Sequence, residues 1–159
     1  FDKLRAANLK VTGKKCRFFA ASVEFLGHKI SNSGIETCAD KVQAIKDWEI
    51  PRTKKALRSF LGVTGFYRRF IEQYSTIAKP LTVLTGDKVD FSWTQDCQKA
   101  FDSLKERLTS SPVLGFPRAG GRYVLHTDAS DCGLGCTLQQ EQDGKLVVIS
   151  YGSKTLGPS

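Results

Sequence analysis

The sequence lacks several features that would assign it to a familiar class at once. It has no methionine, and no apolar run approaches the roughly 18 residues of a membrane span. It contains no C-x-x-C pair and no glycine-rich loop with the spacing of a nucleotide-binding motif. Because it opens with neither an initiator methionine nor a secretory signal, we expect a piece of a longer, intracellular polypeptide. With 40% hydrophobic and 25% charged residues, it has the composition of a globular protein.

Acidic residues are scarce in the first half of the chain. Residues 1–75 contain 15 Lys and Arg against 7 Asp and Glu, whereas residues 76–159 contain 9 of each. The whole net charge of +8 therefore belongs to the first half. Such an asymmetry is typical of a surface that binds a polyanion, although solubility alone would also account for a basic half.

Five cysteines are scattered along the chain, at positions 16, 38, 97, 132 and 136. An odd number without a secretory signal indicates reduced thiols. Cys132 and Cys136 are four residues apart, but no further Cys or His stands near enough to complete a zinc site. We expect these side chains to be buried in the fold.

Hydrophobic periodicity predicts an α+β fold in which a hairpin is followed by helices and then by strands. The hairpin is expected in "SVEFLGHKIS", with Gly27 at a tight bend. Helices are expected in "KVQAIKDW" with Asp40 as N-cap, from Lys54 to about residue 67 with Thr53 as N-cap, in "STIAKPLTVLT", and in "QDCQKAFDSLKERLTSS" with Thr94 as N-cap. After two glycines at 120–121, three strands follow in "RYVLHTD", "GLGCTLQQ" and "KLVVISY". Asp143-Gly144 predicts a two-residue hairpin turn between the last two.

The stretch "RSFLGVTGFYRRF" at residues 58–70 combines three arginines, two glycines and four aromatic rings on one predicted helix. Spacing separates a buried stripe of Leu57, Phe60, Leu61 and Thr64 from a second stripe of Arg58, Gly62 and Phe66. The second stripe would suit a duplex groove, with a guanidinium for phosphate, no side chain at closest approach, and a ring against the sugars. Lys54, Lys55, Arg68 and Arg69 would flank it with positive charge. The alternative is that Gly62 packs against another helix and that Phe66 belongs to the core.

Asp128 is the one candidate for metal chemistry. It ends a strand pattern in "HTDASDCGLG", beside small residues that would leave its carboxylate accessible to a divalent ion. A single aspartate is not a metal site, and a structural strand-end aspartate is the alternative interpretation. His28 and His126 have no nucleophile or second histidine at a useful spacing, which favours strand or groove positions over catalysis.

Five ordered fragments together resemble one family. They are "VEFLGHKIS", "RSFLGVTGFYRRFI", "IAKPLTVLT", "FSWTQDCQKAFDSLKERLTSSPVL" and "HTDASDCGLGCTLQQ", and they cover nearly the whole chain. They are similar to the reverse transcriptase–RNase H of gypsy-type LTR retrotransposons and related retroviruses. The resemblance implies that residues 1–36 are the end of the polymerase palm with its primer-grip hairpin, and that residues 37–85 are the thumb. Residues 86–118 would then contain the connecting helix, and 119–159 the first strands of an RNase H-like domain.

The resemblance also implies roles for particular residues. Phe25, Leu26, Gly27 and His28 match the hairpin that grips the primer near its 3′ end, while Arg58, Gly62 and Phe66 match the helix that tracks the duplex groove. Asp128 matches the first metal-binding carboxylate of the nuclease, which uses Mg²⁺. The expected partners are an RNA–DNA or DNA template–primer duplex and the remainder of the Pol polyprotein, without a membrane.

The sequence departs from a complete enzyme of that family. The paired polymerase aspartates and the remaining nuclease carboxylates are absent, so both metal sites are incomplete, and two-metal catalysis requires several carboxylates. We therefore expect RNA-directed DNA polymerase and RNase H activity in the parent protein, located in the cytoplasm or a virus-like particle, but none in this chain alone. The alternative is a domesticated or degenerate remnant that binds nucleic acid without chemistry. An open reading frame that continues into the missing motifs would favour the first hypothesis, and true termini would favour the second.

Overall fold

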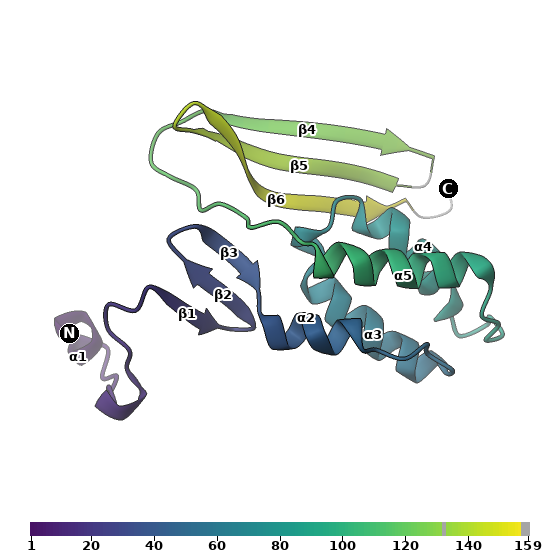
Figure 1. Ribbon diagram of the computed structural model, residues 1–159, viewed down its shortest axis with the longest axis horizontal. Helices are drawn as coiled ribbons and strands as arrows, with labels where there is room; N and C mark the ends of the chain where they lie inside the picture. The colour runs from purple at the N-terminus through teal and green to yellow at the C-terminus, as the bar shows by residue number, and fades with distance from the viewer. Residues whose placement is uncertain (132, 157–159) are drawn as a thin grey trace.

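A computed structural model describes residues 1–131 and 133–156 and contains two small sheets joined by a helical unit (Figure 1). The first part comprises α1 (Asp2–Ala6), η1 (Gly13–Lys15), β1 (Ser22–Phe25), β2 (His28–Ser31) and β3 (Gly34–Thr37). The helical unit comprises α2 (Ala39–Lys46), α3 (Lys54–Phe66), η2 (Arg68–Phe70), α4 (Tyr74–Leu84) and α5 (Gln95–Thr109). The second sheet comprises β4 (Tyr123–Ser130), β5 (Gly133–Gln142) and β6 (Lys145–Thr155). This arrangement confirms the predicted α+β class.

Side-chain caps set the start of two helices. The Thr53 hydroxyl accepts a hydrogen bond from the Ala56 amide at 3.2 Å and thereby caps α3. Thr94 caps α5 in the same way through the Cys97 amide at 3.3 Å. The prediction of Asp40 as N-cap was wrong, because α2 begins earlier, with Cys38 in the cap position. Asp40 lies in the first turn instead, where a negative charge favours the helix N-terminus.

Each sheet contains one two-residue turn with positive φ angles, between β1 and β2 in the first sheet and between β5 and β6 in the second. Leu26 and Gly27 have φ angles of 48° and 78°, and Asp143 and Gly144 have φ angles of 52° and 75°. Both sheets are antiparallel in the order of the sequence, β1-β2-β3 and β4-β5-β6. The strand β3 was not expected from the sequence. Asn32 and Ser33 form the turn that leads from β2 into it.

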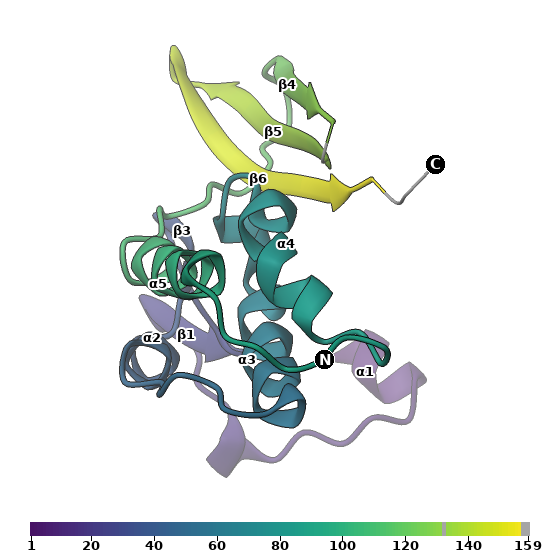
Figure 2. The ribbon, with the colours of Figure 1, turned by 90° about the vertical axis from the view of Figure 1, so that its right-hand side faces the viewer.

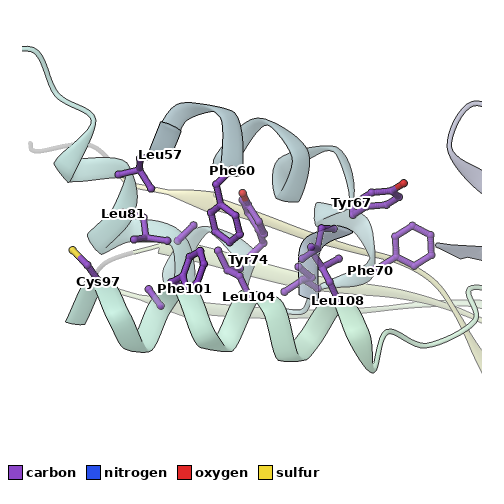
Figure 3. Packing of buried hydrophobic residues seen from close by; sticks show 14 of the residues in the cluster. Leu57, Phe60, Tyr67, Phe70, Tyr74, Leu81, Cys97, Phe101, Leu104 and Leu108 are labelled. Atoms are coloured by element: carbon purple, nitrogen blue, oxygen red, sulfur yellow. The ribbon is translucent and has the colours of Figure 1, made fainter. Parts of the chain in front are cut away.

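The hydrophobic core lies within the helical unit, between α3, α4 and α5 (Figure 3). Phe60 of α3 packs against Phe101 of α5 with ring centroids 4.6 Å apart. The predicted stripe on α3 is confirmed for Leu57, Phe60 and Thr64, each fully buried, whereas Leu61 is half-buried. On α5 the expected stripe of Phe101, Leu104 and Leu108 is buried as well. Fully burying a leucine or phenylalanine stabilises the fold by about 1.5–3 kcal/mol, so this cluster is the main source of its stability.

The second sheet is attached to the helical unit through β6. Figure 2 shows β6 passing across one end of α4, and β6 contacts both α4 and η2. The second sheet therefore packs on α4 and η2. The linker between α5 and β4 pairs with both sheets, because the Ile35 amide donates to the Leu114 carbonyl at 2.7 Å and the Gly115 amide donates to the Val148 carbonyl at 2.8 Å.

Two further expectations concern cysteines and membranes. Cys38 and Cys97 are buried and Cys16 and Cys136 are half-buried, so the prediction of burial is confirmed for two of them. Cys132 lies outside the described residues. Across the part of the chain that the structure describes, no helix combines the length and apolar character needed to cross a bilayer.

Candidate nucleic-acid interface

One face of α3 is turned away from the core and carries the predicted groove stripe. Arg58 and Phe66 are exposed on it, the latter by 53%. Beyond its chain neighbours and the local backbone of α3, a Cβ on Gly62 would meet no atom within 4 Å, so the glycine does not pack against a neighbouring helix. The alternative interpretation of Gly62 as a helix-packing residue is therefore wrong. Lys55 precedes Arg58 by three residues and joins the same face, also exposed.

The β1–β2 turn meets the end of this face at Phe66. The His28 ring stacks on Phe66 with centroids 5.0 Å apart and planes 9° apart. A Cβ on Gly27 would lie 3.3 Å from the Phe66 ring, which shows how closely the turn backbone approaches it. Phe25 and Leu26 beside this contact are exposed by 58% and 73%. The two predicted binding elements are thus contiguous, and we call Leu26, Gly27, Arg58, Gly62 and Phe66 the turn–helix surface.

Two of the predicted basic residues also hold the segment that follows α4. The Arg58 guanidinium donates to the Thr85 carbonyl at 2.8 Å and to Asp87 Oδ1 at 2.9 Å. The Lys54 ammonium donates to the Gly86 carbonyl at 2.6 Å. The Arg58–Asp87 pair is exposed, and such pairs contribute about 1 kcal/mol or less. The ion pair with Asp87 therefore adds little to the stability of this contact.

Arg68 and Arg69, expected beside the groove stripe, have their guanidinium groups bonded to β6. The helix α3 ends at Phe66, and the η2 turn redirects the next side chains toward β6. Arg68 donates to the Ser153 carbonyl, and Arg69 donates to the Ile149 carbonyl at 3.5 Å. These two arginines join the helical unit to the second sheet.

Asp128 lies in β4 with an exposed carboxylate, opposite Gly135 of β5. Its Oδ2 accepts a hydrogen bond from Gln73 Nε2 at 3.0 Å. Gln73 has a left-handed backbone (φ 54°) and is the N-cap residue of α4. In residues 1–131 and 133–156, no three His, Cys, Asp or Glu side chains come together as a metal site. The residues present therefore do not fit a two-metal nuclease centre, and no step of catalysis can be assigned to them.

Burial and the charge of Arg69 lower the pKa of His28 below its usual value. Its Nδ1 is buried, and within the described ranges it has no hydrogen-bond partner. A neutral His28 ring can stack on Phe66 without the free-energy cost of burying a charge. His28 thus acts as an aromatic packing residue between the turn and the helix.

Sequence reasoning missed two residues of this region. Tyr67 is 2% exposed, and its hydroxyl donates to the Gly27 carbonyl at 2.8 Å. Gln73 contacts Asp128 across 55 residues of sequence. The local sequence pattern does not predict either partner. The only available signal was that the hydroxyl of a buried tyrosine requires a hydrogen-bond partner.

Comparison with known proteins finds similar sequences. Residues 93–159 match the RNase H-like domain found in reverse transcriptase. The chain is 35% identical over 97% of its length to the retrovirus-related Pol polyprotein from transposon 412 of Drosophila melanogaster, and 40% identical over 98% to that from transposon 297. It is 36% identical over 96% of its length to the transposon Tf2-3 polyprotein of Schizosaccharomyces pombe. It spans only 12%, 14% and 12% of these three relatives.

Solved structures are similar over most of the chain as well. The foamy viral protease-reverse transcriptase in complex with an RNA/DNA hybrid matches 91% of this chain and 20% of its own, with a TM-score of 0.75 and 26% identity. The same protein in complex with dsDNA matches 91% of this chain and 30% of its own, with the same TM-score and identity.

Proposed function

The chain belongs to the reverse transcriptase–RNase H region of retrovirus-related Pol polyproteins, and from this premise we propose that it holds the template–primer duplex of such an enzyme. In this role the exposed face of α3 lies along the duplex groove, with the ring of Phe66 against sugars. The β1–β2 turn approaches the primer strand beside it. The basic first half of the chain supplies the attraction for phosphates.

The observation that carries this proposal is the open position at Gly62 on a face that is otherwise basic and aromatic. Apart from its chain neighbours and the local backbone of α3, no protein atom comes within 4 Å of a Cβ at this position. A glycine in the middle of an exposed helix costs about 0.5–1 kcal/mol relative to alanine. A close approach by the backbone of a bound duplex accounts for a glycine at this position. The foamy viral relative was solved in complex with an RNA/DNA hybrid and with dsDNA.

The chemistry belongs to the parent protein in this proposal. We propose that the parent is an RNA-directed DNA polymerase with RNase H activity, that it works with the rest of its polyprotein in the cytoplasm or a virus-like particle, and that it uses Mg²⁺. Asp128 would be one of its nuclease carboxylates. This chain would contribute duplex binding and the connection between the two activities.

A fluorescence-anisotropy titration tests the proposal. The probe is a labelled RNA/DNA hybrid of about 20 base pairs, titrated at several salt concentrations. We expect a Kd on the order of 10⁻⁶–10⁻⁴ M near physiological salt, rising steeply with salt because phosphate contacts release counterions. Lys55→Gln should make the plot of log Kd against log salt less steep by about one unit. Lys99→Gln, an exposed lysine on α5, is the matched control and should leave the slope unchanged. No binding, or binding insensitive to salt, would refute the proposal.

A further inference from the structure

The β1–β2 turn adopts a backbone that its first residue does not favour. Leu26 has a φ angle of 48°, a left-handed conformation that non-glycine residues rarely adopt outside Asn and Asp. Its side chain is 73% exposed, so burial does not offset this strain. A strained and exposed residue of this kind is found where the surrounding structure holds it and where the conformation has a use.

Tyr67 is the residue that holds the turn. Its hydroxyl donates to the carbonyl oxygen of Gly27 at 2.8 Å, while its ring is 2% exposed at the end of α3. A Cβ on Gly27 would lie 3.3 Å from this hydroxyl, so the turn backbone lies directly against it. Burial raises the pKa of Tyr67, which keeps the hydroxyl protonated and able to donate.

Aromatic contacts around the hydroxyl complete the attachment. The Tyr67 ring meets the His28 ring edge-on, with centroids 5.6 Å apart and planes 84° apart. It meets Phe66 in the same manner at 4.9 Å. Ring contacts of this kind permit sliding, whereas a hydrogen bond to one carbonyl fixes the orientation of a peptide plane.

We propose that Tyr67 is a positioning residue for duplex binding: its hydroxyl locks the Leu26–Gly27 turn onto Phe66, so that turn and helix meet the duplex as one preformed surface. The inference rests on the proposed function. Without the lock, the strained turn relaxes in the free protein and must be reordered at each binding event. That ordering lowers affinity without removing any contact to the duplex.

Tyr67→Phe tests the proposal, since it removes the hydroxyl and keeps the ring. Tyr74→Phe is the matched control, because Tyr74 lies in the same helical unit and its hydroxyl bonds to Thr64 at 3.0 Å, away from the turn. Thermal melts, anisotropy titrations with the RNA/DNA hybrid, and amide hydrogen exchange are measured for both variants. We expect Tyr67→Phe to weaken binding about fivefold with an unchanged salt slope, and to speed exchange at residues 26–28. Tyr74→Phe should lower the Tm and leave Kd within twofold of the parent.

The outcomes separate this inference from the proposed function. If the unmodified chain fails to bind the hybrid, the proposed function is wrong and the inference with it. If the unmodified chain binds and Tyr67→Phe binds equally well, only the positioning role is wrong. Equal weakening by both variants would assign the effect to general destabilisation, and a Tyr67→Phe variant that does not fold would assign the hydroxyl to the core. Either result would overturn the positioning role.

Discussion

Replacing Gly62 with leucine should raise the stability of the fold and weaken duplex binding. The position lies in the middle of α3 along the chain, and a Cβ there would meet no atom within 4 Å beyond its chain neighbours and the local helix backbone. Leucine is a better helix former than glycine, so the free protein should gain about 0.5–1 kcal/mol of unfolding free energy. For a chain of this size, that corresponds to a rise in Tm of roughly 1–4 °C.

The same substitution should impair duplex binding. A leucine side chain would fill the space in which the proposed function places the sugar–phosphate backbone, displacing the duplex from Arg58 and Phe66. We expect binding to weaken by roughly tenfold, or about 1.4 kcal/mol at 25 °C. Gly62→Ala is the matched control: it provides the same helix-propensity gain with one methyl group, and it should cost much less affinity.

Thermal melts and anisotropy titrations on the two variants would decide the matter. The reasoning is refuted if Gly62→Leu lowers the Tm, because that result would mean that the position is packed. It is equally refuted if the leucine variant binds the hybrid as tightly as the alanine variant. Leu57→Ala is a reference for a packed position, because truncating this fully buried leucine should lower the free energy of unfolding by about 2–5 kcal/mol.

Three further predictions address other parts of the molecule. The pKa of His28 in the folded state lies below the unfolded value near 6.5, so the free energy of unfolding should be highest above that pH and should fall as the pH drops below it. In urea titrations at pH 7.5 and 5.5, His28→Phe should lose less stability between the two pH values than the parent chain. An unchanged pH dependence would contradict the assignment. Because the carboxylates present do not form a two-metal site, the chain alone should neither extend a primer nor cleave an RNA/DNA hybrid with Mg²⁺ or Mn²⁺, and measurable turnover would refute this. The strand β4, an edge strand exposed along almost its whole length, should exchange its amides faster than α3 and α5, and the reverse order would show that the second sheet is the more stable part.

Local sequence rules predicted the elements that depend on local physics. Thr53 and Thr94 cap helices because a threonine hydroxyl satisfies an amide wherever a helix begins, and Asp143-Gly144 forms the expected turn because both residues tolerate a positive φ. The exposed stripe on α3 followed from helical spacing alone. The predicted N-cap of α2, Asp40, is two residues later than the observed cap, Cys38, which is within the usual uncertainty of a helix start.

Long-range contacts were beyond the reach of those rules. Arg68 and Arg69 resemble phosphate-binding residues in the sequence, and only the η2 turn, followed by a sheet some 80 residues later, gives them carbonyl partners on β6. The Gln73–Asp128 contact depends in the same way on how the second sheet packs on α4. In both cases the packing of the second sheet on the helical unit determined the partner.

The central claim is that the turn–helix surface contacts the duplex, and chemical-shift mapping tests it most directly. Amide shifts of the labelled chain would be followed while an RNA/DNA hybrid is added at low salt. We predict that the largest changes occur at residues 25–28 and at Arg58, Gly62 and Phe66, with little change along α5. Changes concentrated on α5 or on the β4–β6 sheet, with residues 25–28 and α3 unaffected, would contradict the account.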